Sequence, residues 1–391
     1  LLATPQSLRR SWMRLLPPDD AADLLQASDE PETRGELLAL LDEATRREVM
    51  TLLAYAEDEA GGLMSPRYAR LRPEMSVDEA IGYLRRQAPH VESLQYAYVL
   101  DAGQHLLGVI SLRELFTASG SRRVSDIMIT DLVTITEQTD QESVGQLLAR
   151  YSLAAIPVLD HLGRMQGIVT FDDIVDVVEE EATEDIQKIG GSEALGAPYL
   201  EIGLFEMIKK RAGWLSALFL GEMLTATAMA YYEKAISAAV VLAIFIPLII
   251  SSGGNSGSQA STLIVRALAL SEVRLRDWLR VVRRELAAGL GLGCILGTLG
   301  FIRIVVWQTA FHTYGEHGWL VAATVALSLL GVVLWGTLSG SMLPFVLRRL
   351  GFDPASASAP FVATLVDVTG LVIYFSVASV TLLPVLTGPH R

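Results

Sequence analysis

Long apolar runs in residues 201–391 and short periodic segments in residues 1–200 divide this chain into two regions. A helix needs about 20 mostly apolar residues to cross a bilayer. Runs of this length predict five membrane-spanning helices, at residues 212–230, 235–270, 286–306, 319–347 and 360–386. The second run exceeds one bilayer crossing, so we expect part of it to extend into the cytoplasm.

The polar region begins with short helices and continues with an internal duplication. Residues 1–60 predict amphipathic helices at 19–26, 33–41 and 45–55. Residues 64–184 then contain a β-α-β-β-α unit of ~60 residues twice, and such a repeat defines the architecture. Its predicted elements are a helix at 76–86, strands at 96–100 and 107–111 and a helix from Leu112, then a helix at 141–151, strands at 155–159 and 167–170 and a helix from Phe171.

A polar, glycine-rich run from Gly253 to Gln259 interrupts the second apolar segment. Polar backbone within a membrane is tolerated only where it is buried in protein or lines a water-filled path. A soluble linker would not lie between two apolar runs. The run therefore indicates a channel or a transporter.

Asp367 is an ionisable residue within the fifth predicted span. A carboxylate costs about 2.5–3.5 kcal/mol at the centre of a spanning helix, so it must face the bundle interior or water. Its helical neighbours Pro360, Ala363 and Thr364 are small enough to admit a hydrated ion, so we expect Asp367 to be a cation site lined by them. The alternative is a packing role, with Asp367 hydrogen-bonded to residues 253–259. For Glu222 in the first span we expect a packing or lipid-interface role.

Charge is distributed unevenly between the two regions. Residues 1–200 carry 17 basic and 34 acidic residues, a net charge of −17, and residues 201–391 carry 14 basic and 10 acidic residues, a net charge of +4. An acidic surface argues against nucleic acid as a partner and suits cations. Loops rich in Arg and Lys alternate with loops that are poor in them, which predicts a multi-pass protein of the cell (inner) membrane, with its N-terminal half cytoplasmic and its C-terminus outside.

An acidic segment, residues 172–185, joins the polar region to the first span. Helical spacing places Asp173, Asp176 and Glu180 on one stripe. Like charges at this spacing repel each other, so we expect the acids to face a second acidic surface across water-mediated Mg²⁺. The alternative is a solvated helix face. The other side of the helix is predicted to be apolar and to carry Ile174, Val175, Val177 and Val178.

The duplicated region resembles a tandem pair of CBS domains, most specifically in the run from Gly167 to Asp173. The resemblance implies that Thr170 and Asp173 bind ATP or another adenine nucleotide. The first copy has Ser111 and Glu114 at the matching positions, so one nucleotide site is expected rather than two. The alternative is a structural module with an empty cleft.

The order of these segments, together with residues 245–269 and 353–375, is similar to the MgtE family of magnesium channels. The resemblance implies a homodimer closed by cytosolic Mg²⁺, with Asp367 as the selectivity carboxylate of a pore between the second and fifth spans. Gly254 and Asn255 would then line the pore too. An odd number of spans also favours a pore on a two-fold axis. The resemblance further assigns cytosolic Mg²⁺ sensing to Asp173, Asp176, Glu181, Glu184, Asp185, Asp140, Glu142, Asp19 and Asp23.

We therefore predict a multidomain membrane protein with four parts. They are a partial α-helical N-domain at 1–60, an α/β tandem CBS pair at 64–171 (64–125 and 126–171), an acidic connector helix at 172–200 and an all-α transmembrane domain of five helices at 201–391. Three departures from the family stand out: a short N-domain in a chain that begins at Leu1, as if truncated or processed, Ser256 where Ala or Thr is common, and Ala359 where Gly or Asn is frequent.

The predicted partners are a second copy of the chain, membrane lipid and Mg²⁺ ions, and the predicted cofactors are Mg²⁺ and the adenine nucleotide. A carrier for Co²⁺, Mn²⁺ or Zn²⁺ remains an alternative, although no thiolate or imidazole near Asp367 in the sequence favours a soft metal. Another class of CBS-regulated membrane protein, such as an anion channel, is disfavoured by Asp367. A membrane protease is also disfavoured, because His312 and His317 do not have the spacing of a zinc motif. We therefore predict that the chain is not an enzyme.

Overall fold

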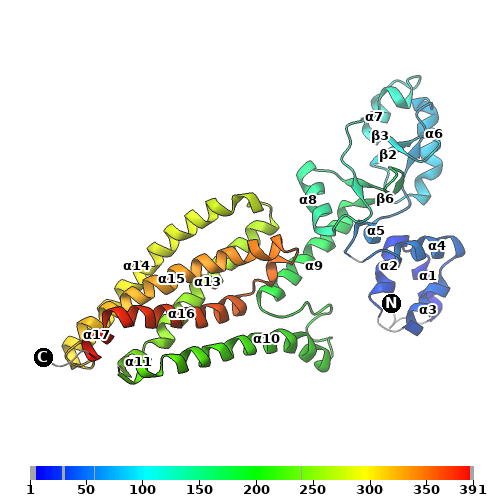
Figure 1. The fold of residues 1–391 in the computed structure, drawn as a ribbon. Helices are drawn as coiled ribbons and strands as arrows, with labels where there is room; N and C mark the ends of the chain where they lie inside the picture. Colours follow the sequence, from blue (N-terminus) through cyan, green and yellow to red (C-terminus); the bar gives the residue numbers. More distant parts are fainter. Residues whose placement is uncertain (1–5, 29–30, 57, 239, 388–391) are drawn as a thin grey trace. The chain divides into compact units, whose positions relative to one another are not determined.

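The computed structural model describes residues 6–28, 31–56, 58–238 and 240–387. The chain forms two compact units, Leu1–Glu181 and Ala182–Arg391. The first contains the N-terminal helices and two small sheets, and the second is a bundle of long helices (Figure 1).

Five helices open the first unit: α1 (Gln6–Met13), α2 (Pro18–Gln26), α3 (Pro31–Leu40), α4 (Glu43–Leu52) and α5 (Ala60–Leu63). Local sequence explains their starts. Pro18 occupies the first turn of α2, where its missing N–H costs nothing. Asp42 caps α4 by accepting hydrogen bonds from the Ala44 and Thr45 amides, at 3.0 and 3.1 Å.

The predicted duplication is confirmed, because each copy forms a three-stranded sheet of the same topology. In each sheet the first strand runs parallel to the second, and the second runs antiparallel to the third. The Tyr96–Ser111 pair of the first sheet corresponds to the Ala155–Thr170 pair of the second. The strands are β1 (Arg70–Leu71), β2 (Tyr96–Leu100), β3 (Leu106–Ser111), β4 (Ile135–Thr136), β5 (Ala155–Leu159) and β6 (Met165–Thr170). The helices are α6 (Val77–Gln87), α7 (Leu112–Thr117) and α8 (Gln141–Tyr151), with 3₁₀ turns η1 (Ala88–His90) and η2 (Val124–Asp126).

The acidic connector is helical only as far as Ile189, and the prediction that the helix continues to residue 200 is wrong. Helix α9 (Phe171–Ile189) is followed by Gly191, which has φ +80°, a conformation that glycine adopts without strain. The expectation of one continuous apolar side is also wrong in part. Ile174 and Val177 are buried in the core shared with the N-terminal helices, but Val175 and Val178 are 52% and 57% exposed.

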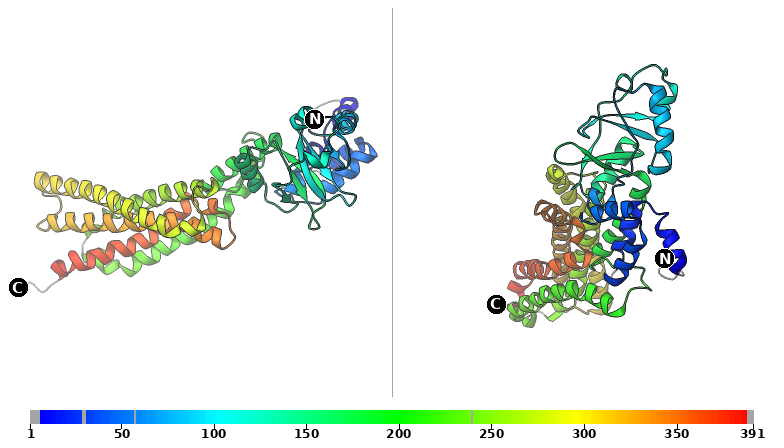
Figure 2. Two further views of the ribbon diagram at one scale, coloured as in Figure 1. Left: turned by 90° about the horizontal axis from the view of Figure 1, so that it is seen from above. Right: turned by 90° about the vertical axis from the view of Figure 1, so that its right-hand side faces the viewer.

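The second unit confirms five helices that are long and apolar enough to cross a membrane. The four from α13 to α16 pack side by side, and α10 lies along α16 (Figures 1 and 2). The second predicted span is divided, because α13 starts afresh with Pro247 in its first turn. The helices are α10 (Leu204–Tyr231), α11 (Glu233–Ala238), α12 (Val240–Ala243), α13 (Ile246–Ala269), α14 (Trp278–Phe311), α15 (Gly318–Arg349), α16 (Ala359–Thr381) and α17 (Leu383–Thr387), with 3₁₀ turns η3 (Leu275–Asp277) and η4 (Pro354–Ser356).

Candidate cation path and acidic cluster

The glycine-rich run is regular helix in the middle of α13, and two of its glycines serve helix packing. A Cβ on Gly336 or Gly340 of α15 would collide with the carbonyl oxygen of Gly253 or Gly257. Both helices therefore use a pair of glycines four residues apart to bring their backbones close, as interacting membrane helices commonly do. This part of the run holds the bundle together and is buried.

Another face of the same helix is polar and exposed within the single chain. Ser251, Asn255, Gln259, Thr262 and Arg266 follow one another at intervals of three or four residues, and all five are exposed. That spacing places them on one stripe of α13. Asn255 donates a hydrogen bond of 3.5 Å to Ser251, and Thr262 donates one of 2.9 Å to the Ser258 carbonyl oxygen. The Gln259 and Arg266 side chains have no hydrogen-bond partner among the described residues, so their side of the stripe must face water or another protein surface.

Helix α16 carries Asp367 and packs against α13 next to this stripe. A methyl group on Gly254 would lie 3.5 Å from the Ala363 Cβ, one helical turn before Asp367. The Ser258 and Ser261 hydroxyls donate hydrogen bonds of 3.1 and 2.7 Å to the carbonyl oxygens of Ala359 and Ala357, which fix the start of α16 against α13.

Asp367 is half-buried and accepts no hydrogen bond from the residues that the structure describes, including those of the run 253–259. Glu222 of α10 lies close enough to repel it electrostatically. Thr364 packs beside Gly221, where a methyl group would lie 3.1 Å from the Thr364 Cγ2. Asp367 and Glu222 therefore lie near each other, a proximity that the sequence did not indicate.

In the first unit, acidic side chains gather around Asp19 at the start of α2. Asp19 is only 5% exposed, and its Oδ1 has no hydrogen-bond partner among the described residues. Burial, followed by the charges of Glu92 and Asp173, raises the pKa of Asp19 to about 8. Burial is also the largest cause of the raised pKa values of Asp173 and Glu92. We call Asp19, Asp20, Glu92, Asp172, Asp173 and Asp176, which interact electrostatically, the acidic cluster.

The acidic cluster includes three of the predicted sensor residues, namely Asp19, Asp173 and Asp176. The sequence analysis missed Asp20, Asp172 and Glu92. The first two adjoin predicted residues, but no sequence signal pointed to Glu92. Among the described residues, no three Asp, Glu, His or Cys side chains converge closely enough to hold a metal ion directly.

The other predicted sensor residues have different surroundings. The Asp140 carboxylate caps α8 by accepting a hydrogen bond of 3.2 Å from the Ser143 amide. The Gln141 amide donates to Glu181 at 2.6 Å. The Glu142 carboxylate accepts a hydrogen bond of 3.2 Å from Gln146. Glu184 forms an ion pair with Lys188. For Asp23 and Asp185 the sensor role also stays a prediction.

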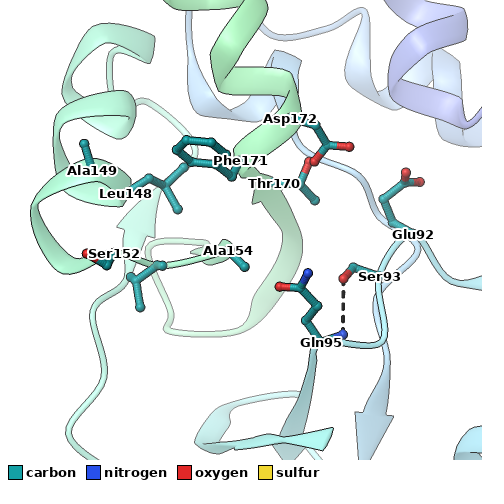
Figure 3. A pocket seen from close by; sticks show the side chains of 11 residues that line it. Glu92, Ser93, Gln95, Leu148, Ala149, Ser152, Ala154, Thr170, Phe171 and Asp172 are labelled. Atoms are coloured by element: carbon teal, nitrogen blue, oxygen red, sulfur yellow. Dashed lines mark hydrogen bonds between the residues drawn. The ribbon is translucent and has the colours of Figure 1, made fainter.

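A cleft of about 790 Å³ lies between the two copies of the duplicated unit. Figure 3 shows Leu148 and Ala149 of α8 and Ser152, the residue after α8, on one side of it, facing Glu92 and Ser93 on the other. Thr170 lines the cleft as the sequence predicted, but Asp173 does not. The Asp173 carboxylate instead accepts hydrogen bonds from the hydroxyl and the amide of Thr170.

Comparison with known proteins places these features in one family. The model of a divalent cation transporter family matches residues 246–377, the CBS domain model matches residues 60–121 and 124–180, and the model of the MgtE intracellular N domain matches residues 3–58. Magnesium transporter MgtE of Thermus thermophilus is 44% identical over 366 residues, which cover 93% of this chain and 79% of that protein. This chain belongs to the MgtE family.

Two further MgtE proteins are similar to this chain. Magnesium transporter MgtE of Bacillus subtilis is 33% identical and is matched over 92% of this chain and 78% of its own length. A crystal structure of the cytosolic domain of the Mg²⁺ channel MgtE in complex with ATP shares 44% identity and a TM-score of 0.43, over 44% of this chain and 71% of that chain. MgtE proteins form a transport family, so the predicted family and the prediction that this chain is not an enzyme are confirmed.

Proposed function

We propose that this chain is a Mg²⁺ channel whose pore lies on the two-fold axis of a homodimer, between α13 and α16 of the two copies. The exposed polar stripe of α13 carries this proposal. The polar side chains of this stripe that have no partner among the described residues, Gln259 and Arg266, need water or another protein surface within a membrane, and a pore between two copies supplies both. With the N-terminal domains in the cytosol and an odd number of spans, the proposed topology has the C-terminus outside the cell.

Asp367 is the cation site of the proposed pore. Mg²⁺ releases its water reluctantly, so a carboxylate from each copy would hold the hydrated ion through its water molecules. Gly254 and Ala363 pack against each other one helical turn before Asp367, which brings α13 close to α16 at this depth. Pro360, Thr364 and Asn255 complete the predicted lining. Thr364 also packs on α10, so its side of the path includes Gly221.

Transport by the Asp367→Asn variant tests this proposal. The substitution keeps the size of the side chain and removes its charge, so Mg²⁺ influx into proteoliposomes should fall roughly ten- to hundredfold, the effect of losing a charged hydrogen-bonding group. Glu316→Gln, which neutralises an exposed loop acid, is the control and should transport normally. Undiminished Mg²⁺ influx through Asp367→Asn would contradict the proposal. Competition by Co²⁺, Mn²⁺ and Zn²⁺ in the same assay tests the alternative cargoes.

Cytosolic Mg²⁺ closes the proposed channel by binding at the acidic cluster. Burial first, and then the charges of neighbouring carboxylates, raise the pKa values of Asp19, Glu92 and Asp173, which supports a site that favours a bound cation. A hydrated Mg²⁺ would reduce the repulsion between these carboxylates and stabilise the closed arrangement. Because it would bind through its own water, it does not need three converging ligands.

The cleft between the CBS copies is the proposed site of an adenine nucleotide. Thr170 offers a hydroxyl, and Leu148 and Phe171 offer apolar surface for a base. Glu92 and Asp172 also line the cleft, and no Lys or Arg is among the described residues that do. Phosphates would therefore enter together with a divalent cation, so we propose MgATP rather than free ATP as the ligand.

A further inference from the structure

Lys188, on the last turn of α9, lies between two carboxylates from distant parts of the second unit. Its ammonium contacts the Asp353 Oδ2 at 2.6 Å and also pairs with Glu184, one helical turn earlier. The three side chains are 27%, 37% and 35% exposed, respectively. Burial lowers the pKa of Lys188, but its hydrogen bonds to Asp353 and Glu184 outweigh burial and raise the pKa to about 12. The ammonium therefore remains charged at every physiological pH.

The surrounding backbone is tied down on both sides of this contact. The segment after α9 folds back on the helix, because its Leu195 amide donates a hydrogen bond of 2.7 Å to the Gln187 Oε1 of α9. Gly191 packs so closely on α16 that a Cβ there would lie 3.0 Å from the Pro360 Cγ. The Asp353 Oδ1 caps the Ala355 amide at 2.8 Å, which orients Oδ2 toward Lys188.

The α16 side is anchored as well. The Trp214 indole of α10 donates a hydrogen bond of 3.1 Å to Ser358, the residue before α16. Glu184, Lys188 and Trp214 line one cavity of about 360 Å³. Lys188 is therefore one of several contacts that join the connector to the start of the helix that carries Asp367.

We propose that Lys188 is a tethered cation that holds the connector helix on the N-terminal end of α16, so that this junction is a permanent link and not a Mg²⁺-sensing site. Two carboxylates that face each other would otherwise need a cation from solution. An ammonium on the same chain is present at a high effective concentration and needs no Mg²⁺. Glu184, predicted from the sequence to be a sensor, is then already neutralised, and sensing is left to the acidic cluster.

This inference deepens the proposed gating, because a fixed link transmits any movement of α9 to the pore helix. Lys188→Met keeps the apolar stem and removes the charge. Glu184 and Asp353 would then repel each other until a divalent cation replaced the ammonium. The variant should therefore make a Mg²⁺-independent contact depend on Mg²⁺.

Distances between spin labels test the link directly in the full-length protein. Labels are placed at Ile186→Cys and Phe352→Cys, two exposed positions beside Lys188 and Asp353, in a Cys294→Ser background. Labelled subunits are diluted with unlabelled ones, so that distances within one chain dominate. In EDTA the doubly labelled protein that retains Lys188, here called the parent, should give a narrow distribution of label-to-label distances. Lys188→Met should give a broad distribution, and added Mg²⁺ should narrow it again. A narrow distribution for Lys188→Met in EDTA would overturn the proposal.

Two matched variants control for charge and for folding. Lys188→Arg keeps the cation and should behave as the parent, whereas Lys209→Met removes an exposed positive charge nearby and should also leave the distribution narrow. Asp353→Asn keeps the cap on Ala355 but removes the charge. This variant should broaden the distance distribution, and Mg²⁺ should not narrow it again. Broadening by Lys209→Met equal to that by Lys188→Met would show a general charge effect and would also overturn the link.

Channel closure provides the second measurement. Closure of Lys188→Met should need several-fold more cytosolic Mg²⁺ than closure of the parent, and Lys188→Arg should close as the parent does. Equal Mg²⁺ dependence of Lys188→Met and the parent would show that the ion pair does not transmit gating. If the parent itself does not close with Mg²⁺, the proposed gating fails, while the spin-label distances still decide whether the link exists.

Discussion

Asp19 illustrates how one residue can store the free energy that a bound ion releases. Its carboxylate is buried, lacks a partner at Oδ1 among the described residues and faces Glu92 and Asp173. A buried charge of this kind costs stability unless it is neutralised by a proton or a cation. A cation bound at the acidic cluster, as proposed, would remove this cost.

Replacing Asp19 with Asn should stabilise the metal-free protein by roughly 1–3 kcal/mol, because the neutral carboxamide is less costly to bury than a carboxylate and is not repelled by Glu92 and Asp173. The pKa of Asp19 is raised from 3.8 to about 8, so the folded state holds a proton that the unfolded state releases. Wild-type stability should therefore fall as pH rises through this range, and the advantage of Asp19→Asn should grow. Hydrogen exchange of the α2 amides, measured in the full-length protein in EDTA at several pH values, reports the stability of the wild type and the advantage of Asp19→Asn.

Added Mg²⁺ should protect α2 in the wild type and much less in Asp19→Asn. The exposed acid Asp131, changed to Asn, is the matched control and should respond to Mg²⁺ as the wild type does. Equal protection by Mg²⁺ in wild type and Asp19→Asn would show that Asp19 is not part of a cation site.

At the scale of elements, the two β-α-β-β-α copies are alike in backbone and different in chemistry. Ser111 and Glu114 cap α7 with a reciprocal pair of hydrogen bonds, and Thr170 and Asp173 occupy the matching positions at α9. Asp173 also belongs to the acidic cluster, so the end of β6 joins the nucleotide cleft to the proposed Mg²⁺ site. A nucleotide in the cleft and a cation at the cluster should therefore influence each other's affinity.

Titration calorimetry of the full-length protein should detect binding of MgATP and little binding of ATP in EDTA, because Glu92 and Asp172 repel free phosphates. Thr170→Val should weaken binding about tenfold, the effect of losing one good hydrogen bond. Thr117→Val, on the exposed side of α7, should leave it unchanged. Equal affinity for ATP with and without Mg²⁺ would contradict the proposed ligand, and unchanged binding by Thr170→Val would exclude Thr170 from the site.

For the whole molecule, the distribution of charge is consistent with the proposed role of Mg²⁺ as both cargo and regulator. Residues 1–200 carry a net charge of −17, so their mutual repulsion opposes compaction and bound cations would reduce it. An ion shifts the closed–open balance only through its different affinity for the two states. Several weak sites that favour the closed state can together give closure near a narrow Mg²⁺ concentration.

Asp173→Asn combined with Asp176→Asn should leave the channel open at a Mg²⁺ concentration that closes the wild type. Fewer acids mean less repulsion but also weaker Mg²⁺ binding, so the direction of the effect decides between a sensor and a solvated surface. Cleavage of α9 by a glutamate-specific protease, titrated with Mg²⁺, reports closure, and Mg²⁺ influx is measured in parallel. Glu36→Gln on α3 is the control. Protection of the double variant at the wild-type Mg²⁺ concentration would favour a solvated surface.

Local pattern alone determined much of this protein. Periodicity located five spans and both copies of the duplicated unit, because hydrophobic length and strand alternation are properties of neighbouring residues. Asp367 was recognisable as an intramembrane carboxylate for a similar reason, because an acidic residue within an apolar run stands out in the sequence however the helix packs. The short motif from Gly167 to Asp173 likewise located the cleft through Thr170.

Contacts between distant residues depended on the tertiary structure. Glu92 joins Asp19 and Asp173, Glu222 approaches Asp367, and Lys188 reaches Asp353, although none of these pairs has a periodic relation in the chain. The glycines of α13 look alike in sequence, yet Gly253 and Gly257 lie between α15 and α16, whereas Gly254 meets α16 alone. Which face of a helix meets which neighbour is decided by the packing of whole elements, and no single segment contains that information.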